Sequence, residues 1–213
     1  MLPARLILIR HGHIAGNTPS EARVNGWTDF PLSSLGWRQV EALRLRMASE
    51  PPAAARYASP LQRAFETARA LDGLPFGPLH PLDELKEIYC GEVDGWEVAE
   101  LRRCHSQLCE ALLRQEDDDI RWPGGESLRE FRARCIAGMD RIAAAHPGER
   151  ILAVTHAWVI GQILGVLQGC RPAVWQEYRP GNCSLTEIEW GNGGGRLFRF
   201  DDRAHLAGLP EEP

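Results

Sequence analysis

The sequence predicts an α/β protein, a three-layer α/β/α sandwich around a mostly parallel central sheet. Two strongly apolar runs, residues 5–9 and 150–155, have the composition of strands that are buried on both faces. Amphipathic segments of helical periodicity alternate with such strands along the chain. This alternation is typical of a sheet covered by helices on both sides. Because no linker or internal repeat interrupts it, we expect a single domain over residues 1–213.

The first half of the chain supplies two pairs of a strand and a helix. The strand at residues 5–9 is followed by an amphipathic helix over residues 34–49, which ends before two prolines. A weaker strand over residues 54–59 leads into a helix over residues 60–71, with Pro60 in its first turn.

The middle of the chain contains more loop signals. Glycine and proline are frequent in residues 73–82, which are expected to form a turn-rich connection. Residues 87–95 follow as a glycine-bounded loop, and residues 96–115 have the pattern of one helix. The acidic run at residues 116–119 is most simply a solvated helix end.

The last third returns to the alternating pattern. A tight loop at residues 122–127 precedes a long helix over residues 128–145. The strand at residues 150–155 is followed by an apolar helix over residues 157–167. Two further strands, joined by a glycine-rich turn, form a closing hairpin that is expected to add an antiparallel edge; they span residues 184–190 and 196–201.

The composition is that of an ordinary globular chain with a small acidic surplus. Of its 213 residues, 44% are hydrophobic and 25% are charged, and the formal net charge at pH 7 is −5. Proteins that bind nucleic acids or anionic membranes usually carry a basic surplus, so neither partner is expected. Arg10 and His11 cut short the first apolar run, which excludes a signal peptide there, and polar residues interrupt residues 151–170. We therefore expect a cytoplasmic protein.

The cysteine and histidine spacings do not favour a metal site. The six cysteines include no C-x-x-C pair, and in a cytoplasmic chain of this size they are expected to be reduced. His11 and His13 form an H-x-H pair, but no second pair of ligands stands at a spacing that zinc sites use. The sequence predicts neither a metal nor another cofactor.

Both strongly apolar strands are followed by a histidine. His11 comes after the first strand, and His156 directly follows residues 150–155. In open α/β sheets the ligand crevice lies beyond the carboxyl ends of the parallel strands. If the two strands are neighbours, both imidazoles open into the same crevice, where they act on a ligand or are merely two loop residues.

Three further polar residues extend this constellation: Arg10, Arg63 near the start of a helix, and Glu87 in the glycine-bounded loop. Two guanidiniums and a helix N-terminus form a site for a dianion such as a phosphate group. A carboxylate beside that dianion would repel it but is suited to donate a proton, with its pKa raised by the same negative charge. Taken singly, each arginine is more simply a surface ion pair; the joint pattern indicates phosphate chemistry.

Several short motifs occur in a fixed order along the chain. They are Arg10-His11-Gly12 with Asn17, Asp29-x-Pro31-Leu32-Ser33-x-x-Gly36, Ser59-Pro60-Leu61-x-Arg63-Ala64-x-x-Thr67-Ala68, Leu85-x-Glu87 with Gly91, Pro123-Gly124-Gly125-Glu126-Ser127, and Val154-Thr155-His156-Ala157. In this order they resemble the histidine phosphatase or phosphoglycerate mutase-like superfamily, and the resemblance spans almost the whole chain.

The resemblance implies the predicted fold and a phosphohistidine mechanism that needs no metal. His11 would attack phosphorus as a neutral imidazole and form a covalent intermediate. Glu87 would protonate the leaving alkoxide and then deprotonate the hydrolytic water. The phosphate oxygens would be held by Arg10, Arg63, Asn17 and His156, the last as a transition-state stabiliser. The expected partner is a small-molecule phosphomonoester.

Three segments depart from the family pattern. His13 and Ile14 stand where the family usually has Glu or Gln and then Thr or Ser, and Gly161 stands where an arginine is common. The loop at residues 91–95 also differs from the common G-x-W-E-G. The short chain and its T-H-A-W-V-I motif favour hydrolysis. The alternatives are a phosphoglycerate mutase, a broad-specificity phosphatase and a catalytically silent phosphate-binding module.

Overall fold

The computed structural model describes residues 2–15, 22–174, 176–191 and 194–210. Within these residues six strands form one sheet in the order β3-β2-β4-β1-β5-β6. The pairs on one side of β1 are parallel, and the C-terminal hairpin joins β1 on its other side as an antiparallel partner. The strands are β1 (Ala4–Arg10), β2 (Ala55–Ala58), β3 (Leu79–Pro81), β4 (Arg150–Thr155), β5 (Leu185–Gly191) and β6 (Gly194–Asp202).

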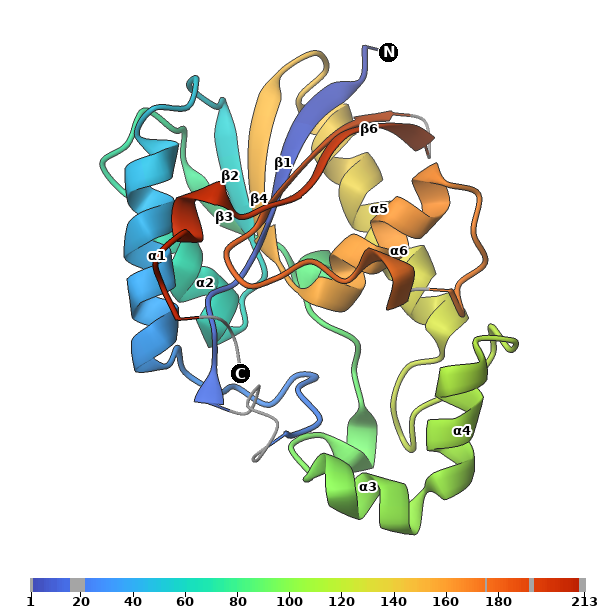
Figure 1. The fold of residues 1–213 in the computed structure, drawn as a ribbon. Coiled ribbons are helices and arrows are strands. Elements are labelled where there is room, and N and C mark those ends of the chain that lie inside the picture. Colours follow the sequence, from blue (N-terminus) through green and yellow to red (C-terminus); the bar gives the residue numbers. More distant parts are fainter. Residues whose placement is uncertain (1, 16–21, 175, 192–193, 211–213) are drawn as a thin grey trace.

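Helices cover both faces of this sheet, which confirms the predicted three-layer α/β/α architecture (Figure 1). One face packs against α1 (Ser34–Met47) and α2 (Gln62–Arg69), and the other against α5 (Leu128–Ala145) and α6 (Ala157–Leu167). Among the described residues, no helix combines the length and hydropathy that crossing a bilayer requires.

Strand β1 divides its side chains between two cores because successive residues of a strand point to opposite faces. Leu6 and Leu8 belong to the apolar cluster formed with α5 and α6, whereas Ile7 and Ile9 belong to the cluster formed with α1 and α2. All four side chains are almost completely buried. The N-terminal strand is thus central to the sheet, and its neighbours β4 and β5 come from residues 150–191.

Most element boundaries agree with the sequence analysis, and α5, β4 and α6 span the predicted residues. Two differences occur in the middle of the chain. A short strand, β3, lies within the expected turn-rich connection, and its Pro81 is tolerated because β3 is an edge strand. A three-residue strand with a proline has too weak a pattern for sequence reasoning to find.

The helix predicted over residues 96–115 is in fact two helices, α3 (Val98–Cys104) and α4 (Ser106–Arg114). His105 interrupts them with φ −130° and ψ 48°, and its ring lies 5.8 Å from that of Trp96. Helix α3 buries Leu101, whereas α4 has no fully buried residue. Figure 1 shows both helices apart from the sheet, on the side toward which the carboxyl end of β1 points.

Helix α5 begins with a complete capping box. The side chain of Ser127 accepts a hydrogen bond from the backbone N–H of Glu130, and the Glu130 carboxylate accepts one from the backbone N–H of Ser127. Two N–H groups that would otherwise lack partners are therefore satisfied at the start of the longest described helix.

We expect Ser127→Ala to lower the free energy of unfolding by about 1 kcal/mol, because it removes one half of this box. Urea denaturation followed by circular dichroism measures the change. The control is Ser106→Ala, which removes an exposed hydroxyl at the start of α4. Equal stability of the two variants would show that the box does not stabilise α5.

Candidate active site

Parallel pairing of β1 with β4 brings the two predicted histidines together. The register pairs Arg10 with Thr155, and the backbone N–H of His11 donates to the carbonyl of Thr155 at 3.0 Å. The rings of His11 and His156 consequently have centroids 5.1 Å apart, at an interplanar angle of 60°. Both residues are buried.

The ring of His11 has a defined tautomer. Its Nδ1 lies 2.7 Å from the carbonyl oxygen of Gly12, and because a carbonyl only accepts, Nδ1 carries the proton. The lone pair is left on Nε2. Burial lowers the pKa of His11 well below its ordinary value, and the nearby guanidiniums of Arg63 and Arg10 lower it further. The imidazole is therefore neutral at pH 7, as a nucleophile requires.

Neighbouring segments hold the His11 loop in place. Asn182 Nδ2 donates to the carbonyl of His11 at 2.7 Å, and the backbone N–H of Gly12 donates to Thr67 Oγ1 at 3.1 Å. Thr67 in turn donates to the carbonyl of Arg63 at 2.7 Å, which ties α2 to the same loop. Sequence reasoning did not predict this contact, since a lone asparagine before a strand carries no signal for it.

The two predicted arginines lie at this loop. Arg10 Nη1 donates to the carbonyl of Pro180 at 2.8 Å. Arg63 is almost fully buried and donates to the carbonyls of Gly26 at 2.7 Å and Thr28 at 3.0 Å. Burial lowers the pKa of Arg63 and the Glu87 carboxylate raises it, and a guanidinium stays cationic throughout.

The helix N-terminus at the pocket differs from the expected one. At the start of α2, the backbone N–H of Gln62 already donates to Asp29 Oδ1 at 2.6 Å. Instead, α6 begins at the pocket, where its first residues Ala157 and Trp158 form part of the lining. The backbone N–H of Trp158 donates to Glu87 Oε2 at 3.4 Å, so the positive end of the α6 dipole faces that carboxylate within the pocket.

Glu87 is a buried carboxyl group in this pocket. Its Oε1 accepts from the backbone N–H of Ile88 at 3.1 Å, and its Oε2 from that of Trp158 at 3.4 Å. Burial raises the pKa of Glu87 to about 6, and the guanidinium of Arg63 opposes this shift. The raised pKa thus has burial as its leading cause, without the phosphate charge that the sequence argument invoked. A carboxyl group with this pKa is suited to both proton donation and acceptance near neutral pH.

The backbone before and at Glu87 is held by an ion pair that sequence reasoning missed. Arg134 makes two bonds to the Glu126 carboxylate, at 2.7 and 2.8 Å. The same guanidinium donates to the carbonyls of Glu84, Lys86 and Glu87. Glu126 belongs to the P-G-G-E-S motif and lies eight residues from Arg134 along the chain. This spacing gives no indication that Arg134 also forms hydrogen bonds with another loop.

His156 lies beside His11 and contacts Ser59. Its Nε2 is 2.8 Å from Ser59 Oγ, whereas its Nδ1 has no hydrogen-bond partner among the described residues. The Ser59 hydroxyl accepts from the backbone N–H of Leu61 at 3.3 Å, so its own proton is available to His156 Nε2. In this arrangement Nδ1–H is a donor for a bound oxyanion. Burial lowers the pKa of His156 well below its ordinary value, with Arg63 adding to the effect, so the ring is neutral.

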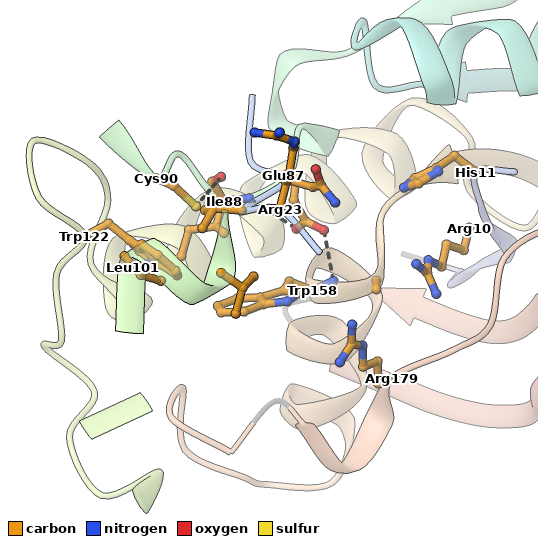
Figure 2. A pocket seen from close by; sticks show the side chains of 14 residues that line it. Arg10, His11, Arg23, Glu87, Ile88, Cys90, Leu101, Trp122, Trp158 and Arg179 are labelled. Carbon is orange, nitrogen blue, oxygen red and sulfur yellow. Dashed lines mark hydrogen bonds between the residues drawn. The ribbon is translucent and has the colours of Figure 1, made fainter. Parts of the chain in front are cut away.

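Arg10, His11 and Glu87 line a cavity of about 220 Å³ (Figure 2), whereas Arg63 and His156 are not among its lining residues. The sequence analysis did not select Arg23, Trp158 or Arg179, which also line it. In Figure 2 the guanidinium of Arg179 points into the space between Arg10 and Trp158. An isolated arginine far along the chain from the motifs gives no sequence signal of such a role.

Two of the residues that depart from the family pattern, His13 and Ile14, are not among those that line this cavity. His13 is buried, with its Nδ1 at 2.8 Å from Ser33 Oγ and its backbone N–H bonded to Gln39. Ile14 is fully buried and pairs with Leu32 in an isolated bridge. Asn17, predicted to contact phosphate, lies outside the described residues. Within the described ranges, no three His, Cys, Asp or Glu side chains group as metal ligands would.

The chain belongs to the histidine phosphatase superfamily, branch 1, which it matches over residues 6–203. It is 32% identical over 159 residues to phosphoglycerate mutase-like protein 4 of Arabidopsis thaliana, covering 74% of this chain and 68% of that protein. It is 30% identical over 159 residues to the metal-independent phosphoserine phosphatase of the same plant, covering 74% of this chain and 66% of the relative.

Solved structures show the same phosphoglycerate mutase-like fold. The α-ribazole phosphatase of Shigella flexneri has a TM-score of 0.81 at 23% identity, covering 93% of this chain and 96% of that one. A phosphoserine phosphatase of Entamoeba histolytica, solved in complex with 3-phosphoglyceric acid, has a TM-score of 0.80 at 24% identity, covering 95% and 99%. Relatives of this chain therefore bind phosphorylated small molecules.

We expect ionisation of Glu87 to destabilise the fold. The folded pKa of about 6 exceeds the ordinary value of 4.5, so the folded state binds the proton more tightly than the unfolded chain. The Glu87 carboxyl group makes its full contribution to the free energy of unfolding below pH 4.5, and this contribution is lost as the pH rises through 6. The change is about 2 kcal/mol, at about 1.4 kcal/mol per pKa unit. The Glu87→Gln variant does not lose this stability, because its side chain does not ionise in this pH range.

The measurement is urea denaturation of both proteins between pH 4 and 7.5. The stability of Glu87→Gln relative to the parent should increase by about 2 kcal/mol over this range. Glu92→Gln, which removes an exposed carboxylate nearby, is the control. A difference that does not change with pH would contradict the raised pKa.

Proposed function

We propose that this protein hydrolyses phosphomonoesters through a covalent phosphohistidine at His11. The observation that carries the proposal is the state of His11: a buried, neutral imidazole whose Nδ1 proton is bound to Gly12, so that Nε2 is the nucleophilic atom. Two guanidiniums and the start of α6 surround it with positive charge. A carboxyl group with a pKa of about 6 stands in the same pocket.

Two steps account for the reaction. In the first, His11 Nε2 forms a bond to phosphorus while the bond from phosphorus to the alcohol oxygen breaks, and protonated Glu87 gives its proton to that oxygen. In the second, the Glu87 carboxylate accepts a proton from water as the water oxygen bonds to phosphorus and the bond to Nε2 breaks. Arg10, Arg63 and the Nδ1–H of His156 stabilise the charge on the phosphoryl oxygens. Asn17 is a further proposed contact, and no step uses a metal.

We propose α-ribazole 5'-phosphate as the first physiological substrate to test, which would place the protein in assembly of the cobalamin nucleotide loop in the cytoplasm. The modest chain length, the P-G-G-E-S-L segment and T-H-A-x-V-I are the features that look most like an α-ribazole phosphatase. Phosphoserine and phosphoglycerate are the competing substrates, because relatives that act on or bind them share the same family.

Two other functions are distinguishable. A phosphoglycerate mutase would return the phosphoryl group to the substrate, whereas a phosphatase releases inorganic phosphate. A silent binding module would have lost a reacting group, yet His11, Glu87 and His156 are all present and buried in one site. The described geometry therefore favours turnover over a silent binding module.

His11→Ala should abolish phosphate release from para-nitrophenyl phosphate and prevent labelling of the protein by a radioactive phosphoryl group. The label on the parent should be acid-labile and alkali-stable, as a phosphohistidine is. His80→Ala, which removes an exposed histidine on β3, should retain activity and is the control. Undiminished turnover by His11→Ala would disprove the proposed nucleophile.

Glu87→Gln should slow hydrolysis of alkyl phosphates by about 10²- to 10⁴-fold, because a poor alkoxide needs the proton. Para-nitrophenolate leaves without protonation, so its phosphate ester should lose much less. Comparing rates across leaving groups of different basicity measures this dependence, with Glu92→Gln as the control. An unchanged rate with alkyl esters would show that another group is the acid.

A further inference from the structure

We infer that the substrate's alcohol carries a planar apolar group, such as an aromatic ring, beyond the carbon that bears the phosphate. This inference rests on the proposed function and names the substrate class of the same site. It follows from the uneven distribution of charged and apolar side chains along the cavity.

The cavity has a cationic end and an apolar end (Figure 2). Arg10 and His11 lie on one side in Figure 2, whereas Ile88, Leu101 and Trp122 lie on the other. Glu87 and Trp158 lie between these two groups, where the bond between phosphate and alcohol must be placed for Glu87 to protonate the alcohol oxygen. The rest of the alcohol therefore extends toward the apolar end.

The apolar end is built to contact a ring. The rings of Trp122 and Trp158 have centroids 6.1 Å apart at 53°, so they present two aromatic surfaces from the middle of the cavity to its apolar end. Val24, Val98 and Leu101 complete the lining there, and the last two belong to α3. Aromatic surfaces and branched aliphatic side chains favour a flat apolar group over a polar one.

Among the described lining residues, the charged groups are unsuited to a carboxylate at the apolar end. Arg23 is engaged by the carbonyl of Gly95 at 3.0 Å and the carboxylate of Glu97 at 3.4 Å. Arg179 points into the space next to Arg10, at the phosphate end. Short phosphorylated acids, such as phosphoserine and phosphoglycerate, would therefore leave the apolar surfaces at the far end uncovered.

The test compares three alkyl esters whose leaving alkoxides are of similar kind: 2-phenylethyl phosphate, ethyl phosphate and O-phosphoserine. Burying a phenyl ring predicts a kcat/KM for 2-phenylethyl phosphate about 10- to 150-fold above that for ethyl phosphate. O-Phosphoserine should be no better than ethyl phosphate. Equal values for all three esters, or a preference for O-phosphoserine, would overturn the inference while leaving phosphatase activity established.

A pair of variants locates the effect. Val98→Asp places a charge in the apolar end and should reduce the ratio of kcat/KM between 2-phenylethyl and ethyl phosphate by about tenfold or more. Ala99→Asp adds the same charge at the next, exposed position of α3 and should leave that ratio unchanged. Val98→Asn is a milder replacement if the aspartate variant does not fold. An unchanged ratio in a folded Val98 variant would contradict this location.

Binding of unreactive phosphonates separates this inference from the proposed function. The parent should bind 3-phenylpropylphosphonate, the methylene analogue of 2-phenylethyl phosphate, at least tenfold more tightly than propylphosphonate in isothermal titration calorimetry. If no ester releases phosphate but this preference holds, the proposed function fails and the ligand class stands. If neither 2-phenylethyl phosphate is preferred over ethyl phosphate nor 3-phenylpropylphosphonate over propylphosphonate, the ligand class is wrong.

Discussion

Parallel pairing of β1 with β4 is the contact on which the rest of the site depends. The hydrogen bond from the His11 amide to Thr155 extends the ladder by one residue, so both histidines leave the sheet at the same edge. Apolar side chains on both faces make a slip of this register costly, because it would turn core residues toward the wrong layer. The packing of the core therefore fixes the positions of the two imidazoles.

Burial sets the protonation states of the groups proposed to react. It also means that charging these groups would destabilise the fold. It keeps His11 neutral and raises the pKa of Glu87, in both cases by penalising the charged form. Such groups need a rigid surrounding, and the ion pair of Arg134 with Glu126 supplies one around Glu87. Gly91 and Gly125 allow the two loops to lie in backbone contact, since a Cβ at either position would overlap the opposite loop.

The sequence predicted the layers, the central strands and five of the candidate site residues that the structure brings together, because apolar runs and ordered motifs are strong local signals. Helix α5 and strand β4 were placed correctly for this reason. The sequence analysis did not predict the break at His105 or the hydrogen bonds from Arg134 to the Glu87 loop. Both depend on contacts between segments far apart in the chain, which periodicity and spacing do not encode.

The separation of α3 and α4 from the sheet divides the molecule's tasks between different parts of the chain. Groups proposed to react come from the sheet edge and its loops, whereas α3 contributes side chains to the apolar end of the cavity. Residues 98–114 are contiguous and outside the three layers. This segment can therefore diverge among relatives, and ligand preference with it, while the chemistry at His11 is left intact.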